Sequence, residues 1–230
     1  MRKIILSSVI SVALGTASFA GFAATTATLA VKGSIEPTSC DISLSTASID
    51  FSTISAASLT DPVNSKMGAP FTLNLTCSGA TAVAVQTTDN RAASAMTTAE
   101  VLSDMGVNMG TAVANASLFG IGTHNTDKKV GFLQLSMSEA NLNGTASSNL
   151  LTSSDKRTWN SKTISSSKRF SLEKDGYFSL ANSASSSTPA AATSASYTLT
   201  PAIVLKHGDH YPGGEAVNID GNVTFSVVYI

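Results

Sequence analysis

The sequence predicts an all-β domain of the sandwich type. Short segments of alternating apolar and polar residues, separated by turn-forming residues, recur along most of the 230 residues. This arrangement is typical of two packed antiparallel sheets. Charged residues make up 13% of the chain, which is about half of the usual share. Together with abundant Ser, Thr, Ala, Gly and Val, this composition is typical of an extracellular β-protein.

The first 23 residues have the features of an export signal. Two basic residues precede an apolar stretch from Ile4 to Leu14, and small-x-small cleavage patterns end at Ala20 and at Ala23. The apolar stretch is too short, and contains too many serines, to act as a membrane anchor. We expect cleavage after Ala23, with Ala20 as the alternative, so that residues 1–23 are a signal peptide.

The segment that follows the signal alternates with the period of a β-strand. Its apolar side chains fall on one face, and a glycine takes one place in that pattern. The face consists of Ala27, Leu29, Val31, Gly33 and Ile35.

The end of the chain alternates in the same way. One face is apolar, and the opposite face carries Asn222, Thr224 and Ser226. The apolar face consists of Val223, Phe225, Val227 and Tyr229. Most domains end in polar tails, whereas here the carboxylate of Ile230 lies one residue beyond a tyrosine of a half-buried strand. We therefore expect this end of the chain to be a recognition element.

Further strands are predicted between these two ends. They are Cys40–Leu44, Ile49–Ile54, Phe71–Cys77, Ala82–Gln86, Leu118–Ile121 and Val130–Met137. Val101, Leu102 and Met105 have helical spacing and predict a short helix within residues 98–109.

The last third of the chain gives weaker patterns. Residues 169–180 predict a hairpin that turns at Lys174-Asp175-Gly176, and the Ser/Ala-rich residues 181–196 predict a loop. Residues 197–206 predict a strand, and Pro201 within it indicates a sheet edge or a bulge.

Cys40 and Cys77 are the two cysteines of the chain. In an exported protein they most simply form one disulfide, because the compartment is oxidising. A redox pair or a thiol nucleophile is disfavoured, since the sequence has no CxxC pattern and no activating base nearby.

These features together resemble the subunits of chaperone–usher fimbriae, the pilins of Gram-negative bacteria. The resemblance is carried by Leu29–Ile35 before Cys40, by the position of Cys77, and by the alternating end with its penultimate Tyr229. It covers both ends and the disulfide segment well, and residues 86–196 poorly.

The resemblance implies an incomplete immunoglobulin-like β-sandwich that a donor strand from a neighbouring subunit completes. Residues 24–36 would be the donor-strand extension and residues 37–230 the sandwich domain. Val223, Phe225, Val227, Tyr229 and Ile230 would form the strand that borders the groove and that the chaperone recognises. The implied partners are a periplasmic pilus chaperone, an outer-membrane usher and other fimbrial subunits, and the implied location is the cell surface, reached through the periplasm.

The physical basis of such assembly is β-augmentation, in which backbone hydrogen bonds set the register and alternate side chains fill pockets. Leu29, Val31 and Ile35 would fill the groove, and Gly33 would fit where a Cβ has no room. The alternative function is a fimbrial adhesin that binds host glycans directly. Two-domain adhesins of this family, however, begin with a receptor domain and have no donor extension.

The sequence does not predict an enzyme, a cofactor or a metal site. Three donors in the loop His207-Gly208-Asp209-His210 do not fix a tetrahedral geometry, and no serine lies in a G-x-S-x-G motif. We expect Trp159 to be a core residue rather than a sugar-stacking platform. The chain without Arg2 and Lys3 is weakly acidic and shows no basic stripe, so nucleic acid is not an expected partner.

Overall fold

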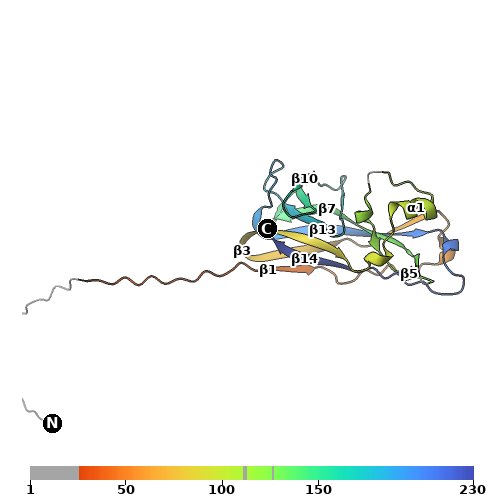
Figure 1. Ribbon diagram of the computed structural model, residues 1–230, viewed down its shortest axis with the longest axis horizontal. Helices are drawn as coiled ribbons and strands as arrows, with labels where there is room; N and C mark the ends of the chain where they lie inside the picture. Colours follow the sequence, from red (N-terminus) through yellow and green to blue (C-terminus); the bar gives the residue numbers. More distant parts are fainter. Residues whose placement is uncertain (1–25, 111–112, 126) are drawn as a thin grey trace, which may run out of the picture. The chain divides into compact units, whose positions relative to one another are not determined.

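The computed structural model describes residues 26–110, 113–125 and 127–230. The chain divides into two units, Met1–Glu36 and Pro37–Ile230. Residues 26–36 of the first unit form neither helix nor strand, and the predicted signal peptide, residues 1–23, lies outside the described residues. The described helices and strands all belong to the second unit, which is an all-β, sandwich-like fold (Figure 1).

The strands of the second unit pair in an antiparallel manner throughout. They are β1 (Cys40–Leu44), β2 (Val63–Met67), β3 (Phe71–Asp89), β4 (Phe119–Gly120), β5 (Thr123–His124), β6 (Lys128–Lys129), β7 (Gly131–Leu142), β8 (Thr145–Ala146), β9 (Asn149–Ser153), β10 (Asn160–Thr163), β11 (Phe170–Ser171), β12 (Tyr177–Leu180), β13 (Ala191–Lys206) and β14 (Val223–Tyr229). The first layer has the order β1-β3-β13-β7-β11, and the second layer has the order β14-β3-β12-β9-β10. Strands β2, β4 and β8 extend the first layer, and β5 and β6 form a separate small ribbon.

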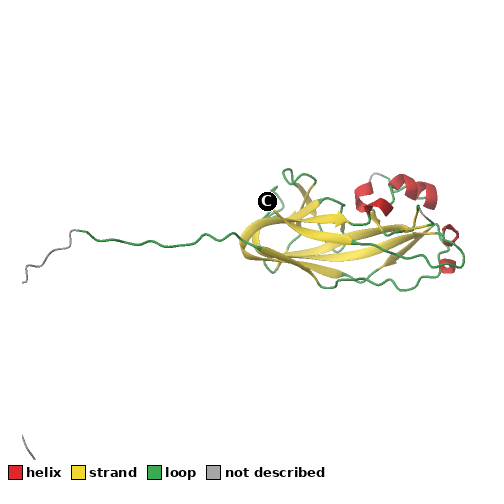
Figure 2. Ribbon diagram, turned by 60° about the horizontal axis from the view of Figure 1, so that its bottom comes forward, coloured by secondary structure: helices red, strands yellow, loops and turns green. Residues whose placement is uncertain are grey.

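The helices are short and gather away from the carboxyl end of β14 (Figure 2). They are α1 (Thr98–Met105) and the 3₁₀ turns η1 (Ala56–Ser58), η2 (Ala92–Ser94), η3 (Asn115–Ser117) and η4 (Gly208–His210). Helix α1 begins with a capping box between Thr97 and Glu100. It ends at Met105 rather than at Met109, because Gly106 adopts the left-handed conformation that terminates helices. None of the described helices has the length and apolar character needed to cross a membrane.

Strand β3 belongs to both layers. Its first part pairs with β1 and β13, and its last part, residues 83–89, pairs with β14. The small residues Ser78-Gly79-Ala80 lie between these parts, and a glycine within a strand permits a sharp bend. The sequence predicted two strands, Phe71–Cys77 and Ala82–Gln86, whereas the structure joins them into one strand that curls from one layer into the other.

Strand β13 is central, although it contains Pro201. Of the two alternatives predicted for Pro201, the sheet edge is wrong, and a shift of register with β7 occurs nearby, between Thr198 and Leu199. The Pro201 carbonyl accepts a hydrogen bond from the Gly68 amide (2.9 Å). On this side of β13 the pairing with β3 ends at Leu199, and the pairing with β2 begins at Ala202. The absent N–H of proline therefore faces the gap between two partner strands and removes no ladder bond.

Three further predictions of secondary structure were wrong. Residues 49–54 form no strand, because Asp50 Oδ1 accepts the Ser52 amide and turns the backbone there. Residues 169–180 form no hairpin, since β11 pairs with β7 while β12 pairs with β3 and β9. The predicted loop at 181–196 ends early, because β13 already begins at Ala191.

The main core lies between the two layers. Buried side chains from both layers meet there, among them Leu73, Val85, Phe178, Tyr197 and Leu199. The rings of Phe178 and Tyr197 meet edge to face at 4.9 Å between centroids. Trp159 lies in a smaller buried cluster with Leu151 and Ala181, as expected for a core residue.

A second core lies beneath α1. Val101 and Met105 of the helix pack against Leu118 and Phe132. Two ion pairs attach the helix to the strands, Lys206–Asp104 (2.6 Å) and Lys129–Glu100 (2.8 Å). The Lys206 side chain is only 6% exposed, so removing Asp104 would leave a buried cation without its partner.

The disulfide predicted between Cys40 and Cys77 is confirmed. The two residues lie opposite each other in the β1–β3 ladder and are 37 positions apart in the chain. The bond therefore fixes the first strand of the domain to β3 next to the bend.

We expect Cys40→Ser to lower the free energy of unfolding by about 4 kcal/mol, because a 37-residue loop is then no longer closed in the unfolded chain. Urea titration of the purified chain measures this change. Cys77→Ser and the double variant should give the same loss. Two reactive thiols in the unmodified chain would contradict the expected bond.

Candidate functional site

The two strands at one side of the sandwich leave an opening between the layers. Strand β1 pairs with β3 in the first layer, and β14 pairs with β3 in the second. Within the described residues, neither has a second strand partner. Because β3 curls between the layers, β1 and β14 face each other across the open side, each with one edge of unpaired backbone groups.

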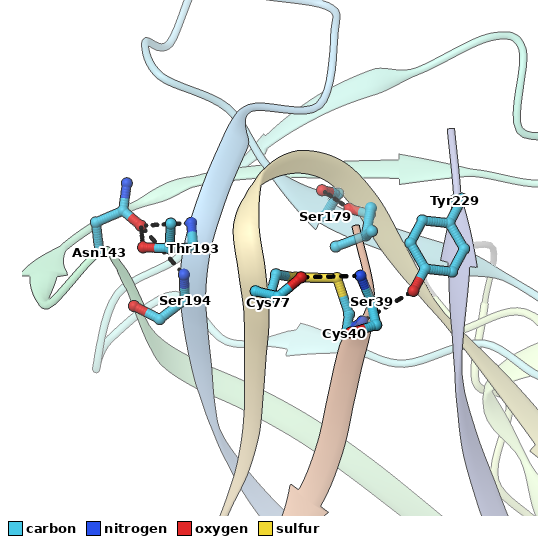
Figure 3. Close-up of a disulfide and its surroundings, with 10 residues drawn as sticks. Ser39, Cys40, Cys77, Asn143, Ser179, Thr193, Ser194 and Tyr229 are labelled. Carbon is cyan, nitrogen blue, oxygen red and sulfur yellow. Dashed lines mark hydrogen bonds between the residues drawn. A yellow bond between two sulfur atoms is a disulfide. The ribbon is translucent and has the colours of Figure 1, made fainter. Parts of the chain in front are cut away.

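A side-chain contact closes this opening at the disulfide end. The Cys40 amide donates a hydrogen bond to the Tyr229 hydroxyl (2.8 Å), which joins β1 to β14 (Figure 3). Beyond Tyr229, the Ile230 amide donates to the Ala82 carbonyl (3.2 Å). The side chain of Tyr229 remains 53% exposed, so its ring lies at the rim of the opening rather than in the core.

Away from the disulfide, the opening continues as a groove of two adjoining chambers. The first has a volume of about 290 Å³. Its walls come from residues 44–51 on one side and 219–225 on the other, with Leu133, Leu135 and Ile203 between them. None of the described residues that line this chamber is charged, and most of them are apolar.

The second chamber continues the groove and has a volume of about 640 Å³. It shares Ile49, Phe51 and Ile219 with the first chamber. Its charged lining residues are Asp50 and Glu215, both acidic. The two chambers therefore adjoin each other along the segment that leads into β14.

One wall of the groove depends on Gly68. A Cβ at this position would lie 2.9 Å from Ile49 Cγ2 and 3.1 Å from the ring of Phe51. The absence of a side chain at residue 68 therefore lets Ile49 and Phe51 sit beside Pro201. Lys66 Nζ adds a hydrogen bond to the Phe51 carbonyl (2.7 Å), which fixes this strand-free wall.

The opposite wall is held by polar contacts. Arg91 forms a bidentate ion pair with Asp220, in which Nε lies 2.8 Å from Oδ2 and Nη2 lies 3.1 Å from Oδ1. The Asp220 amide also donates to the Ile121 carbonyl (2.9 Å). Both charged side chains are about half exposed, so we assign this pair a positioning role with a small contribution to stability.

Tyr211 fixes the far end of the second chamber. Its hydroxyl donates to the Val130 carbonyl (2.7 Å) and accepts from the Lys206 amide (2.9 Å). Burial raises the pKa of Tyr211 to about 12. The phenol is therefore neutral at physiological pH, and its hydroxyl holds the loop of Tyr211 against Val130 and Lys206.

The structure places the predicted C-terminal residues along β14, where Val223 and Phe225 line the first chamber. Val223, Phe225 and Val227 are half-buried and pack against the main core. Tyr229 lies at the rim, and Ile230 is 47% exposed.

The predicted donor residues lie in the separate N-terminal unit and are strongly exposed. Leu29, Val31 and Ile35 are 86%, 87% and 102% exposed as whole residues, and Ala27 is exposed as well. A Cβ built on Gly33 meets no atom within 4 Å. Local structure therefore gives no reason for a glycine at this position.

The sequence pattern did not identify residues 44–54 and 217–221 as groove walls. For the second segment a signal was present, because the alternation of the last strand continues backward through Gly221, Ile219 and Val217. In residues 44–54, the apolar residues led us to predict a strand, although the backbone turns there. Among the described residues, no cluster of His, Cys, Asp and Glu side chains is arranged to hold a metal ion.

The fold and the groove define the class of this protein as an all-β, sandwich-like domain with an open apolar side. Residues 29–134 match a family model described as a protein of unknown function (DUF1120). This match includes the last residues of the N-terminal extension, the disulfide and one wall of the groove. A comparison with curated proteins gave no match.

We expect Tyr229→Phe to lower the free energy of unfolding by about 1 kcal/mol, since the Cys40 amide loses its acceptor while the ring remains. Urea titration measures the loss, and hydrogen exchange should show a less protected Cys40 amide. The matched control is Tyr177→Phe, because the Tyr177 hydroxyl makes no hydrogen bond within the described chain. Equal effects of the two variants would show that the rim contact does not stabilise the domain.

Proposed function

We propose that this chain is a structural subunit of a chaperone–usher fimbria that polymerises head to tail by donor-strand exchange. In this proposal, residues 37–230 form an immunoglobulin-like sandwich that lacks one strand. Residues 24–36 of a neighbouring copy supply that strand by lying in the groove between β1 and β14.

The observation that carries the proposal is the distribution of exposed apolar side chains. Ten large apolar residues are exposed among the described residues. Three of them belong to the extension: Leu29, Val31 and Ile35. Four belong to the strands and segments that border the groove: Leu44, Ile219, Tyr229 and Ile230. Leu44 and Ile219 line the chambers, while Tyr229 and Ile230 end the strand that borders the opening. Most of the exposed large apolar residues thus belong either to the alternating extension or to the open side of the sandwich.

Insertion of the extension has two favourable contributions. Burying Leu29, Val31 and Ile35 contributes about 5–8 kcal/mol at the usual transfer values. The unpaired edges of β1 and β14 add backbone hydrogen bonds to the inserted strand. Both contributions oppose the cost of ordering an extension that has no helix or strand of its own.

The alternation within the extension supports insertion as a strand. Side chains at 29, 31 and 35 would point into the groove, and Gly33 would take a place where the groove has no room for a Cβ. Lys32 lies on the opposite face and would point toward solvent. Because the donor and the groove are different surfaces of one chain, the contact is heterologous and generates a filament when it does not close into a ring.

The proposal also implies partners before assembly. A sandwich with an open groove and two unpaired strand edges is prone to aggregation. We therefore include a periplasmic chaperone that occupies the groove along β14, and an outer-membrane usher that receives the subunit. The assembled fimbria would lie on the cell surface.

We expect a variant lacking residues 24–36 to bind a synthetic peptide of that sequence in a one-to-one complex. Filling the groove should raise the thermal unfolding midpoint by several degrees, because a ligand that binds only the folded state stabilises it. Calorimetry and native mass spectrometry measure both effects. A Gly33→Leu peptide should fail to bind, and a Lys32→Gln peptide, changed on the solvent face, should bind as the original does.

The location of binding needs its own control. Ile219→Glu places a charge in the wall shared by both chambers and should abolish peptide binding. If the peptide gave no stabilisation, or bound the Ile219→Glu variant equally well, donor-strand exchange in this groove would be the wrong mechanism.

A further inference from the structure

A local concentration of positive charge lies at the side of the sandwich opposite the groove. Twelve of the 14 Lys and Arg residues follow Lys3, and five of these twelve lie within residues 156–169, a stretch without a carboxylate. We call these five the basic cluster: Lys156, Arg157, Lys162, Lys168 and Arg169. The net charge of the whole chain is weakly negative and gives no sign of this local cluster. The five residues are also too widely spaced to form a continuous basic stripe in the sequence.

The cationic groups of the cluster are available to a ligand. All five side chains are exposed, and none of them pairs with a carboxylate among the described residues. By contrast, Arg91, Lys129 and Lys206 each form an ion pair with an acidic residue. The basic cluster therefore holds most of the Lys and Arg side chains that form no ion pair with an acidic residue in the described chain.

The loop that carries the first two cations is well ordered by hydrogen bonds. The Asp155 carboxylate accepts the amides of Thr158 (2.8 Å) and Arg157 (2.9 Å), together with the Ser153 hydroxyl (3.0 Å). These bonds lower the pKa of Asp155 to about 2. Lys156 Nζ lies 5.6 Å from the centre of the Tyr177 ring, a cation–π arrangement.

Two further cations of the cluster line a cavity. Between β9, β10 and β12 of the second layer and β11 of the first layer lies a seam with a volume of about 520 Å³. Lys162 lines it from β10, and Arg169 lines it from the residue preceding β11, so the two cations come from different layers. Glu173 is the one acidic residue among its lining residues.

The remaining lining of the seam is suited to a hydroxylated ligand. Polar side chains of Thr152, Ser154 and Asn160 offer donors and acceptors. The half-buried rings of Phe170 and Tyr177 add apolar surface of the kind that the faces of sugar rings contact. Nucleic acid is less suited, because single strands need a series of exposed aromatic platforms.

We propose that this seam binds an acidic polysaccharide, with a carboxylate or sulfate group held between Lys162 and Arg169. Charge-assisted hydrogen bonds to these two residues fix the anionic group. Hydroxyl groups of the same sugar face Thr152, Ser154 and Asn160, and the other cations of the cluster attract the following anionic units. The site lies at the edges of the layers opposite β1 and β14, so it does not depend on the groove or on polymerisation.

The test measures binding of the purified full chain to four immobilised probes by biolayer interferometry. Heparin presents sulfate groups, polysialic acid presents carboxylates, dextran is neutral, and a DNA duplex is a polyanion without the sugar hydroxyl pattern. We expect binding to heparin, to polysialic acid or to both, and the arm that binds identifies the anionic group. Affinity should fall as salt rises from about 50 mM to about 200 mM, as for other polyanion contacts.

Matched variants assign the binding to the seam. The double variant Lys162→Gln/Arg169→Gln should bind the acidic polysaccharide about tenfold more weakly, since two solvent-exposed ionic contacts are lost. Lys128→Gln removes one exposed charge outside the cluster and should bind as the original chain does. The proposal is overturned by any of three results: neither acidic polysaccharide binds at low salt, DNA binds as tightly as they do, or the double variant retains full affinity. The salt dependence of the unmodified chain tests the proposal independently of any variant.

Discussion

The structure depends on the curl of β3. This one strand forms part of both layers, with its bend at the small residues Ser78-Gly79-Ala80, so each of its edges is continued by a different strand in each layer. On one edge the partners are β13 and then β12, which connect to the rest of their layers. On the other edge they are β1 and then β14, and neither has a further neighbour among the described residues. The open side of the sandwich follows directly from this arrangement.

Several other features maintain the open side without filling it. The disulfide attaches β1 to β3 beside the bend, and the hydroxyl of Tyr229 closes the rim there. Gly68 leaves room for the strand-free wall, while Arg91 and Tyr211 hold the segments that surround the groove. The groove is therefore built from fixed walls, and in the proposed function its occupant is the alternating extension of a neighbouring copy.

The parts that the sequence predicts well are those in which local pattern and final environment agree. The all-β class, the disulfide and the apolar face of the last strand fall in this group, because a period of two and two cysteines leave few arrangements open. Helix α1 was predicted in position, and its end is set by the backbone of Gly106. Trp159 was expected in a core, although the cluster that buries it lies apart from the main one.

The features that the sequence predicts poorly depend on tertiary context. A bend within a strand leaves the alternation on both sides intact, so Phe71–Cys77 and Ala82–Gln86 were predicted as two strands. The apolar residues 49–54 suggested a strand, yet their side chains line a groove while the backbone turns. The net charge of the whole chain gives no sign of the basic cluster. Only the fold brings Lys162 and Arg169, from two different layers, to the lining of one cavity.

The most direct test of the central claim is hydrogen exchange of the backbone amides on the open side. The measurement compares the assembled full chain with the variant lacking residues 24–36, using mass spectrometry of fragments that cover residues 40–54 and 217–229. Donor-strand exchange requires new backbone hydrogen bonds to the free edges of β1 and β14, so these amides should exchange at least about tenfold more slowly in the assembled chain. Equal exchange in both samples would mean that the extension does not complete the sandwich, and would contradict assembly by donor-strand exchange.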